Sequence, residues 1–565
     1  MRKQHRNLGF IALLVLLVAA MPIATIGRVA AQDAAGEKVL RVHQSTYPDD
    51  FDPQKSSFTN EIDILQLAYE GLTRLDENQE TVPAAAESWE FNEDATQITF
   101  TLQEGLTYSD GSELTSENFR YAVERTCDPN VAGEYQSILF EVVGCAEFAN
   151  IGFDEEGEEV EFTDEDYEAA RSALGVSAPD PLTLVIDLTN PAPYFATIAY
   201  MWVFYPVKQE IAEEAPDDWW QTAENHIGNG PFTITSIEED QLLTFAANEN
   251  FREGRPILDG IEYVYQGESA VALEAYQAGD LDIIQLDPAQ IPDVRDDPEL
   301  SEQYVEYPVA WTSNLAFNLT QEPFDDIKVR EAFSLAFDRE TYCTEIRNGD
   351  CSSTLSWIPE GIPGAIETDQ FGYDAEAAVA ALAESSYGGP EGLPEISMFY
   401  NSDDTSNTAR AEYVAGQYRD VLGVEITLEP TEGTALVDLR KSPETFPQML
   451  LVGGWIQDYP DPQNWLSVYW KCDATFALRF GYCNEEFDAL VEQADQESDP
   501  EVRIPLYEEA GQILVDDIPG PFLYNVLQTV LVKPYVTGYT PGASDAEWPG
   551  QSASLMTLDI ERPAD

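Results

Sequence analysis

Residues 396–429 contain the pattern that constrains the fold most, because a strand, a helix and a second strand follow one another there. The segment ISMFY (396–400) is typical of a buried strand, and VEITLE (424–429) alternates between apolar and polar residues. Between them, Gly423 ends a helical pattern of apolar residues: Ala411, Val414, Tyr418, Val421 and Leu422. Strands joined in this way pair in parallel through a right-handed crossover. The pattern therefore predicts an α/β fold, with any ligand at the carboxyl ends of the parallel strands.

Strand and helix patterns alternate along the rest of the chain as well. Apolar and polar residues predict strands over four more segments: 39–43, 97–103, 182–188 and 281–286. Apolar stripes predict four more helices: 63–69, 116–126, 269–278 and one that begins at Asp325 or Asp326. Ser116 is the expected N-cap of the second helix, and Gly279 is expected to end the third. The very polar stretch 150–180 predicts an acidic surface insertion, and no repeat of fixed period is present.

The N-terminus has the features of a secretory signal peptide. Arg2, Lys3 and Arg6 precede an almost wholly apolar stretch, 8–21, and small residues follow at 29–31. We expect residues 1–31 to be this leader, which places the protein in the periplasm or on the outer face of the cytoplasmic membrane. The alternative is an uncleaved membrane anchor, although the apolar run is short for a span of about 20 residues.

Acidic residues outnumber basic ones to an unusual degree. The chain has 105 Asp and Glu against 28 Lys and Arg, a net charge of −77, and four of the bases lie in the predicted leader. Such a surface repels nucleic acids and anionic lipids, so we expect neither as a partner. The charge can aid solvation in a salty or acidic exterior, attract cationic ligands, or reflect drift in composition. Because acids occur in nearly every segment, we favour the first or the third explanation.

Six cysteines fit an exported protein, and they fall into three close pairs. We predict three local disulfides, although the sequence alone does not fix the connectivity: Cys127 with Cys145, Cys343 with Cys351, and Cys472 with Cys483. The alternative, a metal cluster, is disfavoured because the chain has no CxxC pair and only His43 and His226 follow the leader. We therefore expect neither a metal nor a cofactor.

Five segments in order resemble one known family. They are the long segment 81–125, IGNGPFTI (227–234), NENFREGRPILDGIEY (248–263), the helix-containing segment 314–340, and GWIQDYPDPQNW (454–465). Together they are similar to the extracellular solute-binding proteins of family 5, the oligopeptide-, dipeptide- and nickel-binding receptors of ABC importers. The resemblance covers nearly the whole chain after the leader.

The resemblance implies an α/β, two-lobed, periplasmic-binding-protein-like fold of type II, with an extra subdomain in lobe one. Lobe one would contain three stretches of chain: 39–78, 226–308 and 520–560. The extra subdomain would be 79–225 and lobe two 310–519, with crossings near 308–312 and 518–521. We expect a monomer that closes on its ligand.

Asp458 is the residue to which the resemblance assigns the clearest role, because in peptide receptors of this family the Asp of this motif pairs with the ligand's α-ammonium. An ammonium in a dry cleft needs a carboxylate partner, and Pro460 and Pro462 would stiffen the loop. Trp455 matches a tryptophan that lines the cleft, and Tyr459 lies beside Asp458 in the motif. Bracing of the loop by Asp458 and core packing of Trp455 are the structural alternatives.

Other residues have weaker assignments. Tyr135 and Tyr524 correspond to positions near the ligand in the family, with purely structural roles as the alternative. The Asp52–Pro53 pair resembles a family motif, although a turn is the simpler explanation, and Trp202 and Trp357 are expected in the core. No arginine can be assigned to a peptide carboxylate, including Arg330, Arg339 and Arg410.

The resemblance implies a receptor that captures peptides and delivers them to the permease of an ABC importer. An oligosaccharide or another small solute on the same fold is the main alternative, since tryptophan platforms also suit sugars. Nickel is disfavoured because few imidazoles are present. An exported hydrolase is a distant alternative, because no G-x-S-x-G, HExxH or Cys/His arrangement occurs. We expect no enzymatic activity and no catalytic residues.

Overall fold

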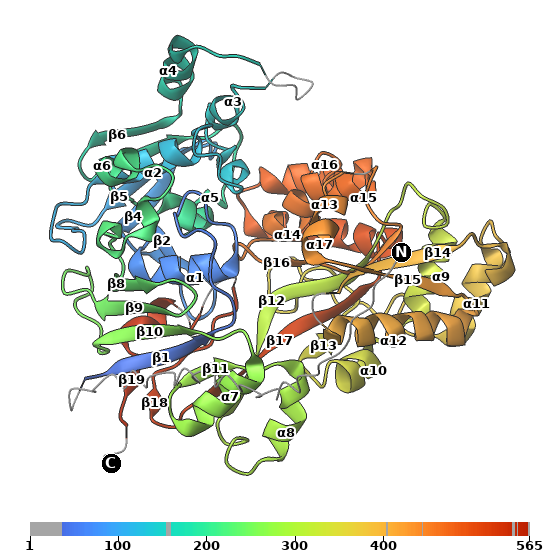
Figure 1. Cartoon of the computed structure of the whole chain (residues 1–565). Helices are drawn as coiled ribbons and strands as arrows, with labels where there is room; N and C mark the ends of the chain where they lie inside the picture. Colours follow the sequence, from blue (N-terminus) through green and yellow to red (C-terminus); the bar gives the residue numbers. More distant parts are fainter. Residues whose placement is uncertain are drawn as a thin grey trace, which may run out of the picture. The chain divides into compact units, whose positions relative to one another are not determined.

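Two long antiparallel strands, β12 (Tyr304–Phe317) and β17 (Phe522–Val532), lie at the centre of the fold (Figure 1). In the described part of the chain they belong to a mixed sheet of eleven strands, in the order β15-β14-β16-β12-β17-β11-β1-β10-β9-β8, with β13 beside β17. The bounds of the other strands are β1 Val39–Gln44, β8 Phe232–Glu238, β9 Leu242–Ala247, β10 Gly260–Tyr265, β11 Ile283–Gln285, β13 Cys351–Ser353, β14 Ile396–Asn401, β15 Ile426–Thr431 and β16 Met449–Ile456.

The structure is a computed structural model. It describes residues 37–153, 160–402, 405–442, 444–544, 548–550 and 552–562. The predicted leader, 1–31, and the middle of the acidic stretch, 154–159, lie outside the described residues. No helix in the described ranges is long and apolar enough to cross a membrane.

The predicted strand–helix–strand unit is present. Strands β14 and β15 pair in parallel over their whole length, and α12 (Thr405–Leu422) connects them. Ala411, Val414 and Tyr418 are fully buried, as their helical spacing requires. Gly423 follows the helix with φ at +71°, a conformation that glycine adopts readily. The second strand begins at Ile426 instead of residue 424. Residues 424 and 425 connect the turn at Gly423 to the start of the strand.

Strands β12 and β17 join two hydrophobic regions. At one end of the pair, Tyr304 faces Leu531 and β11 lies alongside, while at the other end Asn314 faces Phe522 and β16 lies alongside. One core surrounds β1 and β10, and separate clusters pack around α9 and α12 and around α14 and α17. The architecture is therefore the two-lobed α/β type that the sequence predicts, with both lobes built on one continuous sheet.

Helices cover this sheet and form most of the remaining structure (Figure 1). Their bounds are α1 Thr59–Ala68, α2 Ser116–Thr126, α3 Cys145–Ala149, α4 Asp164–Ser172, α5 Phe195–Ile198, α6 Gln209–Glu214, α7 Ser269–Ala278, α8 Ile291–Asp296, α9 Ile327–Leu335, α10 Arg339–Thr341, α11 Ala375–Glu384, α13 Gly433–Leu439, α14 Pro462–Trp470, α15 Thr475–Phe480, α16 Glu485–Asp495 and α17 Pro500–Asp517. Two short strand pairs lie outside the main sheet: β2 Thr73–Leu75 with β3 Thr81–Pro83, and β18 Val536–Thr537 with β19 Asp559–Ile560.

A second, four-stranded sheet lies between residues 86 and 187, inside the range 79–225 that is predicted to be an extra subdomain. Its order is β4-β5-β7-β6, with the bounds β4 Ala86–Phe91, β5 Gln97–Leu102, β6 Val176–Asp180 and β7 Thr183–Asp187. The acidic stretch contributes α4, in which no residue is buried, and then β6. The described residues of this stretch, 150–153 and 160–180, are exposed or half-buried, as predicted, but its end belongs to a regular sheet.

The start of α2 differs from the prediction. Thr115 is the N-cap: its backbone is extended, and its N–H donates to Oδ1 of Asn118 at 2.8 Å. Ser116 is the first helical residue, and its hydroxyl donates to the carbonyl of Asp180 at 2.6 Å. Serine and threonine are both good N-cap residues. Because the Ser116 hydroxyl is engaged with Asp180, the N-cap position falls to Thr115. By contrast, Asp326 caps α9 as predicted, accepting from the Lys328 N–H at 2.8 Å.

Three disulfides join Cys127 to Cys145, Cys343 to Cys351, and Cys472 to Cys483. These are the predicted pairs, separated by 18, 8 and 11 residues in sequence. The described residues contain no group of three or more His, Cys, Asp or Glu side chains that could hold a metal ion.

Candidate functional site

The loop between β16 and α14 carries Asp458, and it is anchored at both ends. Strand β16 lies beside the central strand β12, which fixes the start of the loop. At the other end, Asp461 caps α14 by accepting from the Gln463 N–H at 2.9 Å, with Pro462 in the first helical position. Arg503 of α17 donates to both carboxylate oxygens of Asp461 at 2.7 Å. This buried ion pair holds the loop that presents Asp458.

The Asp458 carboxylate is almost completely buried, with 3% of the residue exposed. Its Oδ1 accepts from the Tyr135 hydroxyl at 2.9 Å, and its Oδ2 accepts from the Asn464 side-chain amide at 2.8 Å. Burial raises the pKa of Asp458 to about 6, although both hydrogen bonds act in the opposite direction. The carboxylate is thus held in a dry environment in which a cation would be a favourable partner.

Groups distant in sequence meet at this residue. Tyr135 lies 323 residues before Asp458 in the sequence, and Tyr200 lies 258 residues before Asp458. Both tyrosines belong to the region of the small sheet. The Tyr200 hydroxyl donates to the backbone carbonyl of Asp458. Tyr135 also packs edge-on against Trp202, with ring centres 5.0 Å apart. Asp458 therefore lies where the residues around the small sheet meet the loop after β16.

Trp455 begins an aromatic wall next to Asp458. Its indole N–H donates to Oδ1 of Asn464 at 2.9 Å, and the same oxygen accepts from the Asp458 backbone N–H at 3.1 Å. The half-buried indole lies edge-on to Tyr469 and Phe476, at 5.3 and 5.0 Å between ring centres. Asn464 thus links the tryptophan and the carboxylate into one unit.

Tyr459 is buried although it follows Asp458 directly. Only 1% of the residue is exposed, and its ring packs into the core that surrounds β1 and the small sheet. Its hydroxyl donates to the side chain of Gln463. The ring therefore helps to hold the two lobes together in this conformation.

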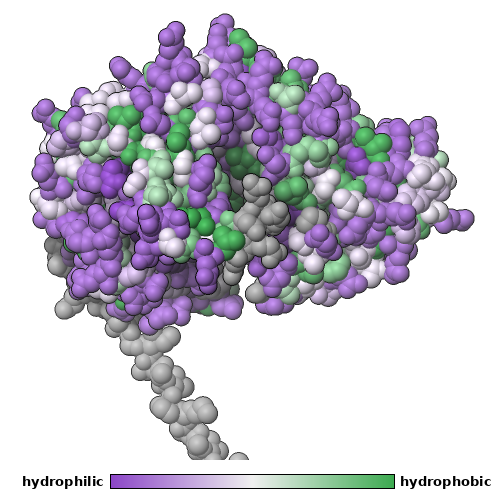
Figure 2. Space-filling view, turned by 90° about the horizontal axis from the view of Figure 1, so that it is seen from above, coloured by the Kyte–Doolittle hydropathy of each residue, from purple (hydrophilic) through white to green (hydrophobic). Residues whose placement is uncertain are grey.

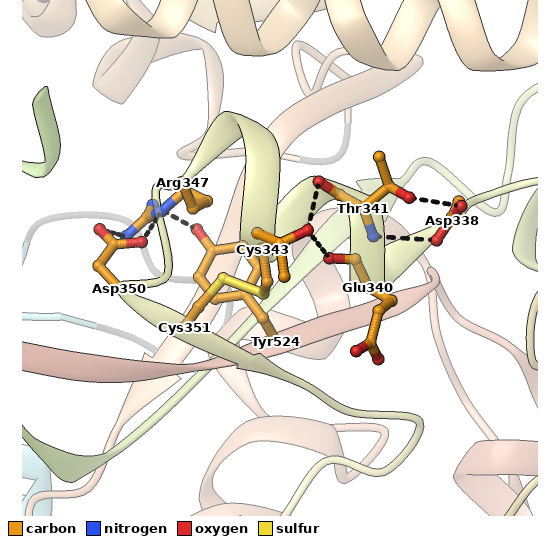
Figure 3. Close-up of a disulfide and its surroundings, with 9 residues drawn as sticks. Asp338, Glu340, Thr341, Cys343, Arg347, Asp350, Cys351 and Tyr524 are labelled. Atoms are coloured by element: carbon orange, nitrogen blue, oxygen red, sulfur yellow. Dashed lines mark hydrogen bonds and ion pairs between the residues drawn. A yellow bond between two sulfur atoms is a disulfide. The ribbon is translucent and has the colours of Figure 1, made fainter. Parts of the chain in front are cut away.

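Tyr524 lies in another environment, beside the Cys343–Cys351 disulfide (Figure 3). Its hydroxyl accepts from Arg347 at 2.9 Å, and the guanidinium lies 4.8 Å from the ring centre. Arg347 also donates to both carboxylate oxygens of Asp350 at 2.7 Å. With 2% of the residue exposed, Tyr524 packs in the core near α9 and α12. The structure brings together Tyr135, Asp458 and Trp455, while the contacts of Tyr524 are with Arg347 and this core.

Asp52 and the two further tryptophans have structural contacts. Asp52 is fully buried, receives two hydrogen bonds of 2.5 Å from Arg125, and accepts from the Trp219 indole at 2.8 Å. The indoles of Trp202 and Trp357 are buried and donate to backbone carbonyls, each at 2.8 Å.

The arginines considered for a peptide carboxylate are engaged elsewhere. Arg330 donates to the carbonyls of Asp517 and Ile518, where the chain enters β17. Arg339 is buried and donates to the carbonyl of Phe522 at 2.5 Å. Arg410 donates to Asn407 at 3.1 Å.

Two residues of the site, Asn464 and Tyr200, are missing from the sequence-based set. Asn464 falls in the motif GWIQDYPDPQNW, on the first turn of α14, six residues after Asp458. Pro460 and Pro462 lie between Asp458 and Asn464 and favour a turn of the loop. The sequence therefore does indicate that these two side chains can meet. Tyr200 has no such signal, because only the packing of the subdomain brings it to Asp458.

Seen from above, hydrophilic residues cover most of the surface, and apolar side chains gather beside a hollow near its middle (Figure 2). This arrangement fits a protein with a solvated exterior and an apolar recess.

Comparison with known proteins places these features in a family. Residues 80–477 match the family described as "Bacterial extracellular solute-binding proteins, family 5 Middle". The oligopeptide-binding protein OppA of Bacillus subtilis is 26% identical, over 88% of this chain and 89% of that protein. An Escherichia coli protein named "Probable deoxycholate-binding periplasmic protein YgiS" is 28% identical, over 93% of this chain and 95% of its own.

Solved structures have the same fold. The unliganded open form of the murein tripeptide-binding protein MppA has a TM-score of 0.74 at 23% identity, covering 93% of this chain and 98% of that one. Haemophilus influenzae OppA in complex with the peptide RPPGFSPFR has a TM-score of 0.73 at 24% identity, with 93% and 99% covered. The match over more than half of the sequence shows that this chain belongs to the bacterial extracellular solute-binding proteins of family 5.

Proposed function

We propose that this protein captures peptides between its two lobes, outside the cytoplasmic membrane, and delivers them to the permease of an ABC importer. The observation that carries the proposal is the buried carboxylate of Asp458, reached by Tyr135 from the subdomain and linked to Trp455 through Asn464. A peptide α-ammonium has three donors and a full charge, and a dry carboxylate is the partner it needs. The relatives named as peptide-binding proteins support the same ligand class.

The lobes in this proposal keep most of their predicted extents, 39–78 and 226–308 for lobe one, 79–225 for its subdomain, and 310–519 for lobe two. The third stretch of lobe one, predicted as 520–560, begins later than predicted. The first crossing near 308–312 coincides with an irregularity in the pairing of β12 with β17. We place the second crossing within β17, later than 518–521. Tyr524 packs in the lobe-two core and Val530 in the lobe-one core, which supports this position.

Ligand binding and closure are coupled in the proposed mechanism. A ligand that contacts both lobes stabilises the closed arrangement only through contacts that the open arrangement lacks. Asp458 is suited to this role because its neighbours come from both lobes. Hydrogen bonds to the backbone of an extended peptide would add affinity without selecting side chains, while the aromatic wall around Trp455 would bury side chains of different shapes.

An oligosaccharide is the second candidate, because Trp455, Tyr469 and Phe476 form an aromatic surface that also suits sugars. The two candidates differ in their use of Asp458, since a neutral sugar gains little from a buried carboxylate. We also propose that the chain performs no chemistry on its ligand. Added peptide should therefore remain at constant concentration for hours, whereas a hydrolase would deplete it.

The test compares randomised tetrapeptides with free amino ends against the same mixture with acetylated ends. Purified protein is incubated with each mixture, and mass spectrometry measures the retained peptides. We expect the free-amine mixture to be retained at least about tenfold better, equivalent to ~1.4 kcal/mol, and Asp458→Ala to remove the difference. Retention of oligosaccharides instead of either mixture would contradict the peptide proposal. Equal retention of the two mixtures would contradict the role of Asp458.

A further inference from the structure

One edge of the central strand β17 has three partners in turn. Strand β13 pairs with residues 524–526, and β11 pairs with residues 530–532. Between them, the Leu527 N–H donates to the backbone carbonyl of Asp350 at 2.8 Å. Asp350 directly precedes β13, so the loop before β13 contacts the stretch of β17 that lies between its two strand partners.

The opposite edge of the same stretch faces the irregular part of β12. The register of this pair shifts between Pro308, which lies opposite Leu527, and Thr312. Such a shift interrupts the ladder of hydrogen bonds and lets the strands bend. The proposed crossings also lie here, near 308–312 in β12 and within β17. The loop before β13 therefore contacts β17 at the place where the proposed hinge would bend.

A disulfide closes this loop and anchors its base (Figure 3). Cys343 and Cys351 are buried in the core around α9 and α12. Within the loop, Arg347 donates to both carboxylate oxygens of Asp350 at 2.7 Å and to the Tyr524 hydroxyl at 2.9 Å. The disulfide and the guanidinium thus fix the loop to one core and to β17.

The tip of the loop reaches a different core. The Asn348 side-chain amide donates to the carbonyl of Pro288 at 3.1 Å, and Arg295 of α8 donates to the Asn348 carbonyl at 3.2 Å. Helix α8 packs with α7 and Leu531 in a separate hydrophobic cluster. Asn348 and Gly349 have φ at +52° and +83°, a conformation that asparagine and glycine adopt more easily than other residues. One short loop is therefore fixed at its base to one core and at its tip to another.

We propose that residues 343–351 form a brace across the hinge, which limits bending at the two crossings and favours the closed arrangement of the lobes. The inference rests on the proposed function, in which 226–308 belongs to lobe one and 310–519 to lobe two. The base of the brace would then lie in lobe two, and its partners Pro288 and Arg295 in lobe one.

The position of the brace explains how it acts without contacting the ligand. The brace lies on the β17 side of the central pair, whereas the Asp458 loop follows β16 on the β12 side. A hinge motion that separates Asp458 from Tyr135 also changes the spacing on the other side of the hinge. The two hydrogen bonds of Asn348 would be lost or lengthened by this change, because a loop whose ends are joined by a disulfide has little freedom to follow it.

The first test removes the disulfide in the ligand-free protein. Cys343→Ser with Cys351→Ser is compared with wild type and with a control, Cys472→Ser with Cys483→Ser. The control removes a disulfide of similar sequence separation, 11 residues against 8. Mass spectrometry measures hydrogen exchange in 524–530, and small-angle X-ray scattering gives the radius of gyration. We expect exchange at least about fivefold faster and a larger radius in the hinge variant, with neither change in the control.

The second test changes the tip and keeps the disulfide. Asn348→Gly tolerates the same backbone conformation and removes the side-chain bond to Pro288. The matched control is Asp240→Gly, at an exposed residue with φ at +58° between β8 and β9. Apparent affinity scales with the fraction of molecules that can close. Retention should therefore fall about two- to tenfold in Asn348→Gly, as expected for one hydrogen bond, and by the same factor for free-amine and N-acetylated tetrapeptides.

Each outcome decides a different point. If neither hinge variant differs from its control in exchange and scattering, the brace is overturned, whatever the peptide measurements show. If exchange becomes faster while scattering and retention match the controls, the loop stabilises β17 alone, and its role in closure is overturned. If the wild type retains no peptide, the proposed function fails, and the ligand-free measurements still decide on the brace. Asn348→Gly, with thermal unfolding as a check, keeps the test valid should the disulfide variant fail to fold.

Discussion

The hydroxyl of Tyr135 donates a 2.9 Å hydrogen bond to the carboxylate of Asp458, across 323 residues of sequence. The donor comes from the region of the small sheet and the acceptor from the loop before α14. A contact of this kind exists only while the lobes are close together. A ligand ammonium would approach the same carboxylate, so closure and binding share one group.

Removing the Tyr135 hydroxyl should favour the open state of the ligand-free protein. In Tyr135→Phe the ring keeps its packing against Trp202, while the hydrogen bond to Asp458 is lost. A bond to a charged acceptor contributes about 1.5–3 kcal/mol, so the ligand-free radius of gyration by small-angle X-ray scattering should increase. Tyr373→Phe, at an exposed tyrosine, is the matched control. Unchanged scattering in Tyr135→Phe would show that this bond does not hold the lobes.

Binding of free-amine peptides should weaken in mild acid. Burial raises the pKa of Asp458 to about 6, and protonation below this value removes the charge that an ammonium needs. We expect affinity at about pH 5 to be roughly tenfold lower than at about pH 7.5, with no such change for N-acetylated peptides. Calorimetric titration across this range checks the prediction. If the affinity for free-amine peptides and for N-acetylated peptides changes equally with pH, the pH effect belongs to a group other than Asp458.

Asp458→Asn should make the protein more stable in mild alkali even as it abolishes ammonium binding. Because the folded-state pKa is raised to about 6, the folded protein holds a proton in the window above the ordinary value of 3.8. The stability linked to Asp458 is therefore present at low pH and lost as pH rises through about 6. A neutral amide avoids this loss, so urea unfolding at about pH 8 should show a gain of roughly 3 kcal/mol, which disappears near pH 4. A variant less stable than wild type at pH 8 would mean that the hydrogen bonds of the carboxylate outweigh its burial.

Arg503 and Asp461 should prove strongly coupled. Arg503 donates to both oxygens of Asp461 at 2.7 Å and to the Tyr507 hydroxyl at 3.0 Å, in a buried position. Removing one partner leaves the other charge buried alone, which costs about 3–5 kcal/mol. Arg503→Gln and Asp461→Asn should each destabilise the protein by about that amount, and the double variant by clearly less than their sum. Additive losses in denaturant unfolding would rule out a direct coupling.

Local patterns predicted much of this fold because the forces behind them act over short distances. The unit from β14 to β15 follows from apolar periodicity and Gly423, and the disulfide between Cys472 and Cys483 follows from close spacing. Asp458 was assigned from a motif of consecutive residues that resembles a motif of the family. Each of these signals lies within a few tens of residues of the chain.

The remaining contacts depend on the packing of distant segments, which no local pattern encodes. Tyr200 reaches Asp458 only because the subdomain folds against the loop before α14. The N-cap of α2 fell on Thr115 because Ser116 bonds to Asp180, 64 residues away.

Stability should rise with salt, because the folded surface concentrates negative charge. The net charge is −77, and most ion pairs have at least one exposed partner, so they contribute little. Raising the ionic strength from about 0.01 M to about 1 M shortens the screening length from ~30 Å to ~3 Å and weakens repulsion between carboxylates. The melting temperature by calorimetry should therefore increase over this range in both NaCl and KCl, and sucrose at equal osmolality should not reproduce the full effect. A melting temperature that does not change with salt would mean that repulsion between carboxylates is already offset. Solvation or drift in composition would then explain the acidic residues.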